Sequence, residues 1–290
     1  LAPDEAGITA AIVAGERGGI SEEITENYRN SGLAHFLSIS GLHMSMIAAM
    51  AFFAVRLLIA LIPAVALRID SKKVAAIFAA VMSLIYLLIS GAEIPSQRAF
   101  ITMLVVLIGI LFGRQAISMR MVAFAAITVL IISPQALVSA GFQMSFAAVV
   151  VLIAFYETYA LKLRKFFAGS GLIKILIAYF AGLMLTDLVA SLATLPFAIY
   201  HFNQVAIYTM LGNLLAGPII AFVIMPFVLL SLFLMPFGLE VLPLKIVGFG
   251  VGLVNTITDY VAHLPAAGYR VMAMPFWGLL LIVLGGLWIC

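Results

Sequence analysis

The chain has 290 residues, of which 65% are hydrophobic and only 9% are charged. A soluble domain carries roughly a quarter charged residues, so this composition excludes a water-soluble globule and indicates an integral membrane protein. The single cysteine, Cys290, excludes an internal disulfide framework and a multi-cysteine metal site. Because the chain does not begin with Met and its last residues lie in an apolar run, we expect a fragment of a longer protein.

Residues 1–39 are the polar part of the chain. They contain six acidic and two basic residues, a balance that argues against a nucleic-acid-binding patch. Ser21 is a predicted helix N-cap, because Glu22 and Glu23 follow it where the helix dipole favours anions. Gly32 is the predicted end of that helix. We therefore expect a helical lead-in that lies outside the membrane or at its surface.

Residues 40–290 predict a membrane domain of about nine helices, since a spanning helix needs about 20 apolar residues. The predicted spans are 41–66, 74–90, 99–113, 119–132, 136–156, 172–199, 205–239, 244–262 and 274–290. The seventh is either one kinked span or two short segments, because glycines and prolines interrupt it. The fold class is therefore an all-α, polytopic membrane bundle with eight to ten spans.

Gly and Pro steps inside or beside these stretches predict broken or re-entrant helices. The steps are Ser40-Gly41, Ile94-Pro95, Leu195-Pro196, Gly212-Asn213 and Gly217-Pro218. Discontinuous helices are tolerated at membrane depth where the freed backbone lines a cavity or is covered by protein. The pattern therefore favours a transporter or channel over a simple anchor.

The cations predict the orientation of the spans. With nine spans, one side receives Arg68, Lys72, Lys73, Arg114, Arg120, Lys162, Arg164, Lys165 and Lys245, and the other receives Arg17, Arg29, Arg98 and Arg270. Cationic loops are retained in the cytoplasm, so the first set is predicted to be cytoplasmic and the lead-in to face outward.

Four neutral polar clusters fall on the predicted outer side. They are HFLSISGLHM (35–44), AEIPSQRA (92–99), SAGFQMSF (139–146) and YHFNQ (200–204). Polar groups in lipid are costly and usually face a bundle interior or a water-filled path. The alternative is that they are interfacial loops, polar because water is near. The candidate path residues are His35, Ser38, Ser40, Gly41, His43, Ser96, Gln97, Arg98, Gln143, Asp187, Asn203 and Asn213.

Two patterns involve the first cluster. Ala34, Ser38, Gly41, Ser45 and Ala48 recur at helical spacing, which predicts one small-residue face used for close packing or for lining a pore. The stretches SGLHMSM (40–46) and AGFQMSF (140–146) share Gly, Met and Ser, which is either a repeat of four spans or a chance match.

Asp187 is the costliest ionisable group, because it falls near the middle of the span 172–199. We expect it to pair, with Arg56 or Arg98 as predicted partners, or to face water. A buried ion pair and a role in a transport path are both open.

The sequence gives little support for a catalytic site or a metal site. The sequence has no HExxH, GxSxG or phosphate-loop motif. His35 and His43 lack a third neighbouring ligand, and Asp187 is alone in its span. We therefore expect no catalysis, no metal ion and no cofactor in this chain.

The ordered polar stretches resemble a known family. AHFLSISGLHMSM resembles the hallmark of the ComEC competence-protein family, usually HLLAISGLH, with Phe36 and Ser38 as mild departures. IPSQRAF, GFQMSFAAV, and LPFAIYHFNQ followed by GNLLAGPI resemble later features of that family, in the same order. The resemblance covers nearly the whole chain.

The resemblance implies a channel in the bacterial inner membrane that passes single-stranded DNA into the cytoplasm during natural transformation. Its implied partners are the DNA strand, membrane lipid, a DNA receptor, and a cytoplasmic motor or single-strand-binding protein. The OB-fold and metallo-β-lactamase-like domains of the family are absent from these residues. The alternatives are a proton-coupled small-solute transporter, in which Asp187 carries the proton, and a structural membrane scaffold.

Overall fold

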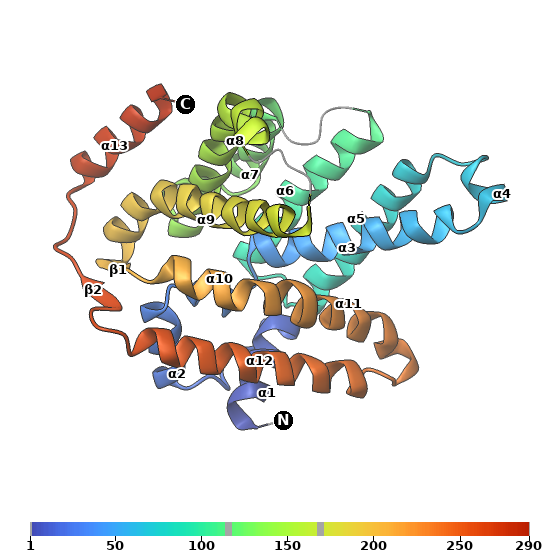
Figure 1. Ribbon diagram of the computed structural model, residues 1–290, viewed down its shortest axis with the longest axis horizontal. Helices are drawn as coiled ribbons and strands as arrows, with labels where there is room; N and C mark the ends of the chain where they lie inside the picture. Colours follow the sequence, from blue (N-terminus) through green and yellow to red (C-terminus); the bar gives the residue numbers. More distant parts are fainter. Residues whose placement is uncertain (1, 114–117, 167–170, 290) are drawn as a thin grey trace.

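The computed structural model describes residues 2–113, 118–166 and 171–289, which form an almost wholly helical chain (Figure 1). Its elements in chain order are α1 (Pro3–Ala14), α2 (Glu22–Asn30), η1 (Ala34–Phe36), α3 (Gly41–Ala60), α4 (Pro63–Ala66), α5 (Ser71–Ile89), α6 (Ile94–Leu111), α7 (Met119–Ile132), η2 (Pro134–Val138), α8 (Ala140–Phe166), α9 (Leu172–Phe202), β1 (Gln204–Ala206), α10 (Thr209–Ile219), η3 (Ile220–Ile224), α11 (Met225–Leu234), η4 (Met235–Phe237), α12 (Val241–Ala262), β2 (Gly268–Arg270) and α13 (Phe276–Ile289). The element η3 is a single π-helical segment, and η1, η2 and η4 are 3₁₀ helices.

The helices pack in three connected groups. Helix α3 packs against α5 and α6, helix α8 packs against α9, and α10, η3 and α11 pack along α12. In Figure 1, α9, α10 and α12 lie one below the other, and α10 contacts both of its neighbours. The short strands β1 and β2 pair antiparallel and connect the end of α9 to the segment that leads into α13.

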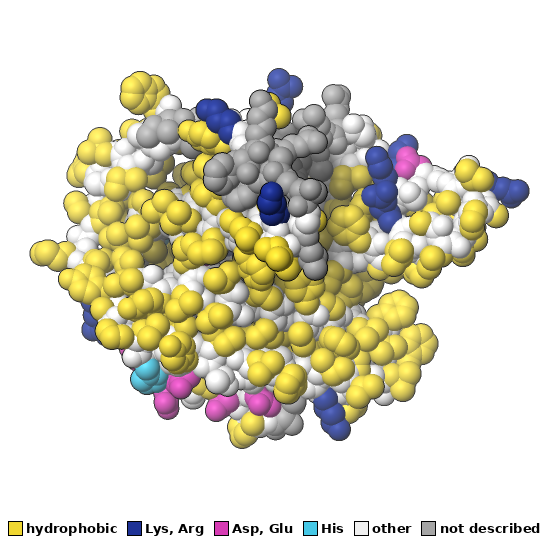
Figure 2. All heavy atoms as spheres, viewed as in Figure 1, with side chains coloured by type: hydrophobic (Ala, Val, Ile, Leu, Met, Phe, Trp, Pro, Cys, Tyr) yellow, Lys and Arg dark blue, Asp and Glu magenta, His cyan; other side chains and the backbone are white. Residues whose placement is uncertain are grey.

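The surface suits a lipid environment and confirms a helical membrane bundle. Among the described residues, six helices are long and apolar enough to cross a membrane. Shorter apolar helices lie at Pro95–Leu111, Met119–Ile132 and Phe276–Trp288. Figure 2 shows hydrophobic side chains over most of one face, with most of the charged side chains toward its edges. Exposed apolar side chains at this density are stable in lipid but not in water.

The predicted spans locate the helices well and their ends less well. Helix α7 coincides with the predicted span 119–132, and Ser133-Pro134 ends it as expected. Helix α3 ends at Ala60 instead of residue 66, because the chain turns there and restarts as α4. Helix α8 begins at Ala140 instead of residue 136, because residues 134–138 form the separate turn η2. Arg114, predicted to be cytoplasmic, lies outside the described residues.

Three of the predicted helix breaks are wrong. The steps Leu195-Pro196, Gly212-Asn213 and Gly217-Pro218 all lie inside helices. Ser40-Gly41 and Ile94-Pro95 instead mark helix starts, with Ser40 as the N-cap of α3. The stretch 205–239 contains one continuous apolar segment from Thr209 to Phe237, so the prediction of one span, as opposed to two short segments, is confirmed. The segment is irregular at η3, which begins two residues after Pro218. Because proline has no backbone N–H, one hydrogen bond of the helix is missing at Pro218.

The lead-in packs into the bundle. Ile8 and Ile12 of α1 are 0% and 1% exposed, in the same hydrophobic cluster as residues of α3, α11 and α12. The hydroxyl of Tyr86 donates to the carbonyl of Ile12 over 2.7 Å, and the hydroxyl of Tyr28 donates to Asn255 Oδ1 over 2.7 Å. Burial raises the pKa of the Tyr28 hydroxyl above its ordinary value, so this donor stays protonated.

The predicted boundaries of α2 are confirmed. Ser21 is its N-cap, because the Ser21 hydroxyl accepts from the backbone N–H of Ile24 over 3.3 Å. Gly32 follows the helix with a φ of +79°, in the left-handed region that favours glycine. It lies against Thr209, and this contact brings the lead-in onto the first turn of α10.

Candidate functional site

His43, in the hallmark stretch, caps a helix. Its ring is 0% exposed and stacks on Phe36 with the ring centroids 5.6 Å apart. Its Nδ1 accepts from the backbone N–H of Ser40 over 3.3 Å and lies 3.0 Å from the Ser40 hydroxyl. Because a backbone N–H only donates, Nδ1 is the acceptor and the ring proton belongs on Nε2. The Ser40–His43 contact therefore fixes the start of α3, with the imidazole buried and Ser40 half-buried.

His35 belongs to a different cluster. It lies exposed on η1, with its Nδ1 facing the carbonyl of Gly32 over 3.2 Å, so Nδ1 donates. Its ring is close enough to Asp187 of α9 to interact with it electrostatically. Asn213 of α10 donates from Nδ2 to Asp187 Oδ1 over 2.6 Å. The lead-in, α9 and α10 thus meet at one half-buried carboxyl group.

The predicted pairing of Asp187 is wrong. Its partner is the amide of Asn213, and Asp187 Oδ2 is buried without a hydrogen-bond partner among the described residues. Arg98 instead donates to Ser139. Arg56 lies over the ring of Phe52, with its guanidinium carbon 5.8 Å from the ring centroid. The sequence places a charge at a depth along its helix but does not say which neighbouring helix it faces.

Three of the predicted polar clusters meet at the start of α8. Arg98 Nη1 of α6 donates to Ser139 Oγ over 3.2 Å. One turn into α8, Gln143 Oε1 lies 2.8 Å from His201 Nε2 of α9. Gln143 Nε2 is already used, because it donates to the carbonyl of Leu137 over 2.9 Å. His201 Nε2 is therefore the donor to Gln143 Oε1.

Ser139 and His201 lie within the quoted stretches SAGFQMSF and YHFNQ but are absent from the candidate residues. Their position inside polar clusters at predicted span ends was the signal that could have found them. A single histidine or serine at a span end does not reveal which helix it will contact.

The other predicted residues have local roles. Gln97 is exposed and donates to the carbonyl of Ala92, and Asn203 ends α9 with a φ of +52°. Ser96 is 1% exposed and its hydroxyl has no partner among the described residues. Ser38 is half-buried, and an added Cβ at Gly41 would have nothing within 4 Å.

The predicted small-residue face of the first span is therefore not a single helix face. Ala34 lies in η1 and Ser38 precedes α3, which begins only at Gly41. Gly41 also marks no close approach of two backbones, since the space beside it is open.

Helix α9 carries a polar face that connects the two clusters. Asp187, Ser191, Thr194 and His201 follow one another at spacings of four, three and seven residues, which places them on one side of the helix. All four are half-buried. Within an apolar window of 18 residues, 0% of the residues of α9 are buried, whereas 39% are buried in the corresponding window of α12. We call these four residues the α9 polar face.

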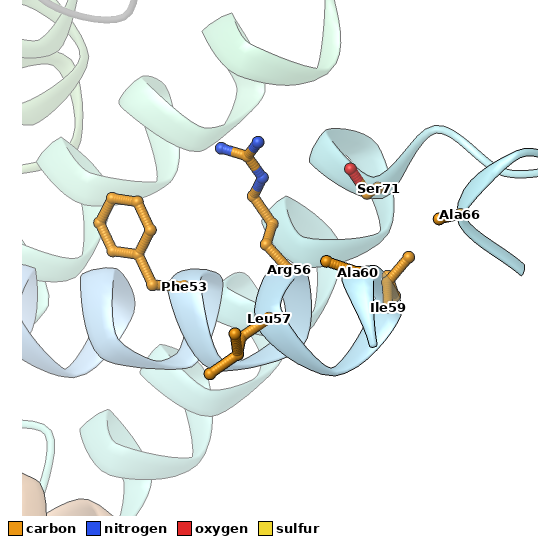
Figure 3. A pocket seen from close by; sticks show the side chains of 7 residues that line it. All are labelled: Phe53, Arg56, Leu57, Ile59, Ala60, Ala66 and Ser71. Atoms are coloured by element: carbon orange, nitrogen blue, oxygen red, sulfur yellow. The ribbon is translucent and has the colours of Figure 1, made fainter. Parts of the chain in front are cut away.

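A pocket near the other end of α3 is separate from these clusters (Figure 3). It is lined by Phe53, Arg56, Leu57, Ile59, Ala60, Ala66 and Ser71. Figure 3 shows the Arg56 side chain extending away from α3 past the Phe53 ring. Within the described ranges, no group of three or more His, Cys, Asp or Glu side chains could hold a metal ion.

Comparison with known proteins identifies the family. A family model described as "Competence protein" matches residues 12–290. The chain belongs to the competence protein family. Within it, the chain is 29% identical to ComE operon protein 3 of Bacillus subtilis over 226 residues, which cover 78% of this chain and 26% of that protein. It is 30% identical to competence protein ComA of Neisseria gonorrhoeae over 203 residues, covering 67% of this chain and 28% of that protein.

This competence-family chain is also 25% identical to recombination protein 2 of Haemophilus influenzae over 232 residues, covering 78% of the chain and 28% of that protein. The chain thus spans only about a quarter of the length of the curated relatives it matches. No solved structure matches it.

Proposed function

We propose that this chain is the membrane part of a DNA-uptake system for natural transformation, and that a single DNA strand passes along the α9 polar face. Membership of the competence family supports the role in uptake. The α9 polar face carries the proposal for the route. It is a row of half-buried polar groups on a helix that its neighbours cover poorly.

The chemistry of this face suits a passage better than a tight binding site. The hydroxyls of Ser191 and Thr194 and the imidazole of His201 can make weak contacts with phosphate and base, and conduction requires that each contact be easily broken. Polar groups at membrane depth are costly unless they pair or face water. Gln143 of α8 and Asn213 of α10 bond to the two ends of the face, which supports its facing a path between these helices.

We propose that this chain moves the strand without a chemical step. Ser40 and His43 are in contact, as in a catalytic dyad, but His43 is 0% exposed and its Nδ1 also accepts a backbone N–H. An active Ser–His pair needs an accessible hydroxyl and a group that orients the base. The test is cleavage of labelled strand by the purified protein, and cleavage lost in Ser40→Ala would contradict this assignment.

We propose the bacterial inner membrane as its location, with the lead-in outside. Arg68 lies in the connection between α4 and α5, and Lys72 and Lys73 lie in the first turn of α5; cations at span ends stay in the cytoplasm. A protease site inserted in this connection should be cut in inside-out vesicles and resist cleavage in intact spheroplasts. The reverse result would invert the topology.

A proton-coupled transporter of small solutes is the second candidate, and Asp187 Oδ2 is the observation that favours it. A buried carboxyl oxygen without a partner can bind and release a proton. Asp187→Asn should abolish pH-dependent solute flux if this candidate is right. If the strand passage is right, DNA uptake should persist in Asp187→Asn, because the hydrogen-bonding shape is kept.

The full-length protein in a transformable host provides the test of the strand route. Thr194→Leu places a bulky apolar side chain on the α9 polar face, and we expect uptake of labelled DNA into the cytoplasm to fall at least tenfold at normal protein level. Leu192→Phe is the matched control, because Leu192 is 59% exposed and lies off that face. Unchanged uptake in Thr194→Leu would contradict the proposed route.

A further inference from the structure

Arg98 has an unusual environment for a cation in a membrane domain. It is half-buried, and Nη1 donates to Ser139 Oγ, just before α8 begins. Its Nη2 lies against Gly141 so closely that an added Cβ there would approach it to 2.5 Å. The guanidinium thus rests on the first turn of α8, and Gly141 gives it the room to do so.

No anion in the described chain balances this charge. The ion pairs among the described residues are Arg17–Glu93, Lys73–Asp70 and His263–Asp259, so Arg98 takes part in none of them. Ser139 is neutral and donates its own proton to the carbonyl of Ala136. Half-buried cations are normally paired, and the positive end of a helix dipole makes an unpaired cation costlier still.

Further donors converge on the same place. Ser139 Oγ already accepts from the backbone N–H of Phe142, and the carbonyl of Ser139 accepts from Gln143. The backbone N–H groups of the first helical residues, Ala140 and Gly141, have no partner within their helix, as at any helix start. An arginine fork beside free N–H groups is a typical arrangement for binding an oxyanion in a bidentate manner.

We propose that Arg98, together with the first turn of α8, binds a phosphodiester group of the DNA strand as it enters the α9 polar face. This inference rests on the proposed function, because it takes the strand as the source of the anion. The site is next to the Gln143–His201 contact, one turn further along α8, so a bound phosphate would lie beside the end of that face. A single such contact orients the backbone without holding the whole strand.

The test uses the full-length protein in phosphatidylcholine nanodiscs and two probes of the same sequence. One is a fluorescent single-stranded oligonucleotide, and the other is its uncharged methylphosphonate analogue. For Arg98→Gln we expect binding of the first probe to weaken about tenfold and binding of the second to stay unchanged. The salt slope of log K for the first probe should become shallower by about 0.7, the value for one phosphate contact on a single strand.

Arg29→Gln is the matched control, because Arg29 is an exposed cation on α2, and it should leave both affinities within twofold. If Arg98→Gln accumulates poorly, Gly141→Ala replaces it, since a methyl group there displaces only the end of the arginine side chain. Gly141→Ala should weaken binding of the charged probe at normal protein level.

Three results for Arg98→Gln would overturn the site. The first two are an equal weakening of binding of both probes and no weakening of binding of either probe. The third is an unchanged affinity for the charged probe together with loss of the phosphatidylglycerol that co-purifies from the host membrane. The last result would identify the anion as a lipid headgroup. Failure of the proposed strand route is a separate outcome. The route is tested by DNA translocation in Thr194→Leu, whereas the Arg98 site is tested by the affinity for the oligonucleotide probe in nanodiscs, where no translocation is measured.

Discussion

The starts of α3 and α8 have similar sequences and different roles. In SGLHMSM, His43 turns back onto the N-cap Ser40 and is completely buried. In AGFQMSF, Gln143 occupies the matching place in the sequence, lies one residue further into its helix, and reaches across to His201 of α9. The local pattern fixes a helix start in both places. The helices packed around each start decide whether the matching side chain closes its own helix, as His43 does, or joins two helices, as Gln143 does.

The largest predicted effect is the loss of stability in His43→Ala, which distinguishes the start of α3 from the start of α8. His43→Ala removes a buried ring and a capping acceptor, so the free energy of unfolding should fall by about 2–4 kcal/mol. We expect a lower melting temperature in detergent and less protein in the membrane. Loss of DNA uptake in His43→Ala at unchanged stability would instead place His43 on the strand path.

Ser40→Ala should have the next largest effect, a loss of about 0.5–1.5 kcal/mol, because the Ser40 hydroxyl lies within hydrogen-bonding distance of His43 Nδ1 at the start of α3. The same melting assay measures it. Ser38→Ala is the matched control, because Ser38 precedes the helix and is not its N-cap. An equal loss in both variants would show that the contact of the Ser40 hydroxyl with His43 contributes no stability.

The contact between α8 and α9 should give a coupling energy of about 0.5–1.5 kcal/mol, the net contribution of one hydrogen bond. A double-mutant cycle of Gln143→Ala and His201→Ala measures it by thermal unfolding. Both variants should lower DNA uptake more than they lower protein level, unlike His43→Ala. Additive effects in the cycle would mean that the two side chains do not interact.

Substitution of Gly41 at the start of α3 or Gly141 at the start of α8 should have the smallest effect on stability. Gly41→Ala meets nothing within 4 Å and replaces glycine in the first turn of a helix, so stability should be unchanged or rise by up to about 1 kcal/mol. Gly141→Ala should be equally mild in the melting assay, since only the end of Arg98 must move. A large loss of stability in either variant would contradict the packing at that helix start.

The sequence predicted the helices because the length of an apolar run depends only on lipid thickness. It therefore located α7 at both ends. It ended the span of α9 at residue 199 and placed a break at Leu195-Pro196, whereas the helix runs through Pro196 to Phe202. A proline inside a helix removes one hydrogen bond, and in a long apolar helix that cost is tolerated.

The polar clusters were predictable and their contacts were not. A pattern along the chain gives the depth of Asp187 and Arg98 but not the direction in which each side chain points from its helix axis. The pairing of Asp187 with Asn213, and of Arg98 with Ser139, depends on which helices pack together. That information resides in the tertiary structure, which also showed that His201 belongs with Gln143.

The most direct test of the strand route is a crosslink to the α9 polar face. A full-length protein without its native cysteines would receive Ser191→Cys on that face or Leu192→Cys beside it, where the side chain is 59% exposed. A maleimide-bearing DNA strand, stalled during uptake by streptavidin at one end, should react with Ser191→Cys and not with Leu192→Cys. Equal labelling of both, or labelling of Leu192→Cys alone, would contradict passage of the strand along α9.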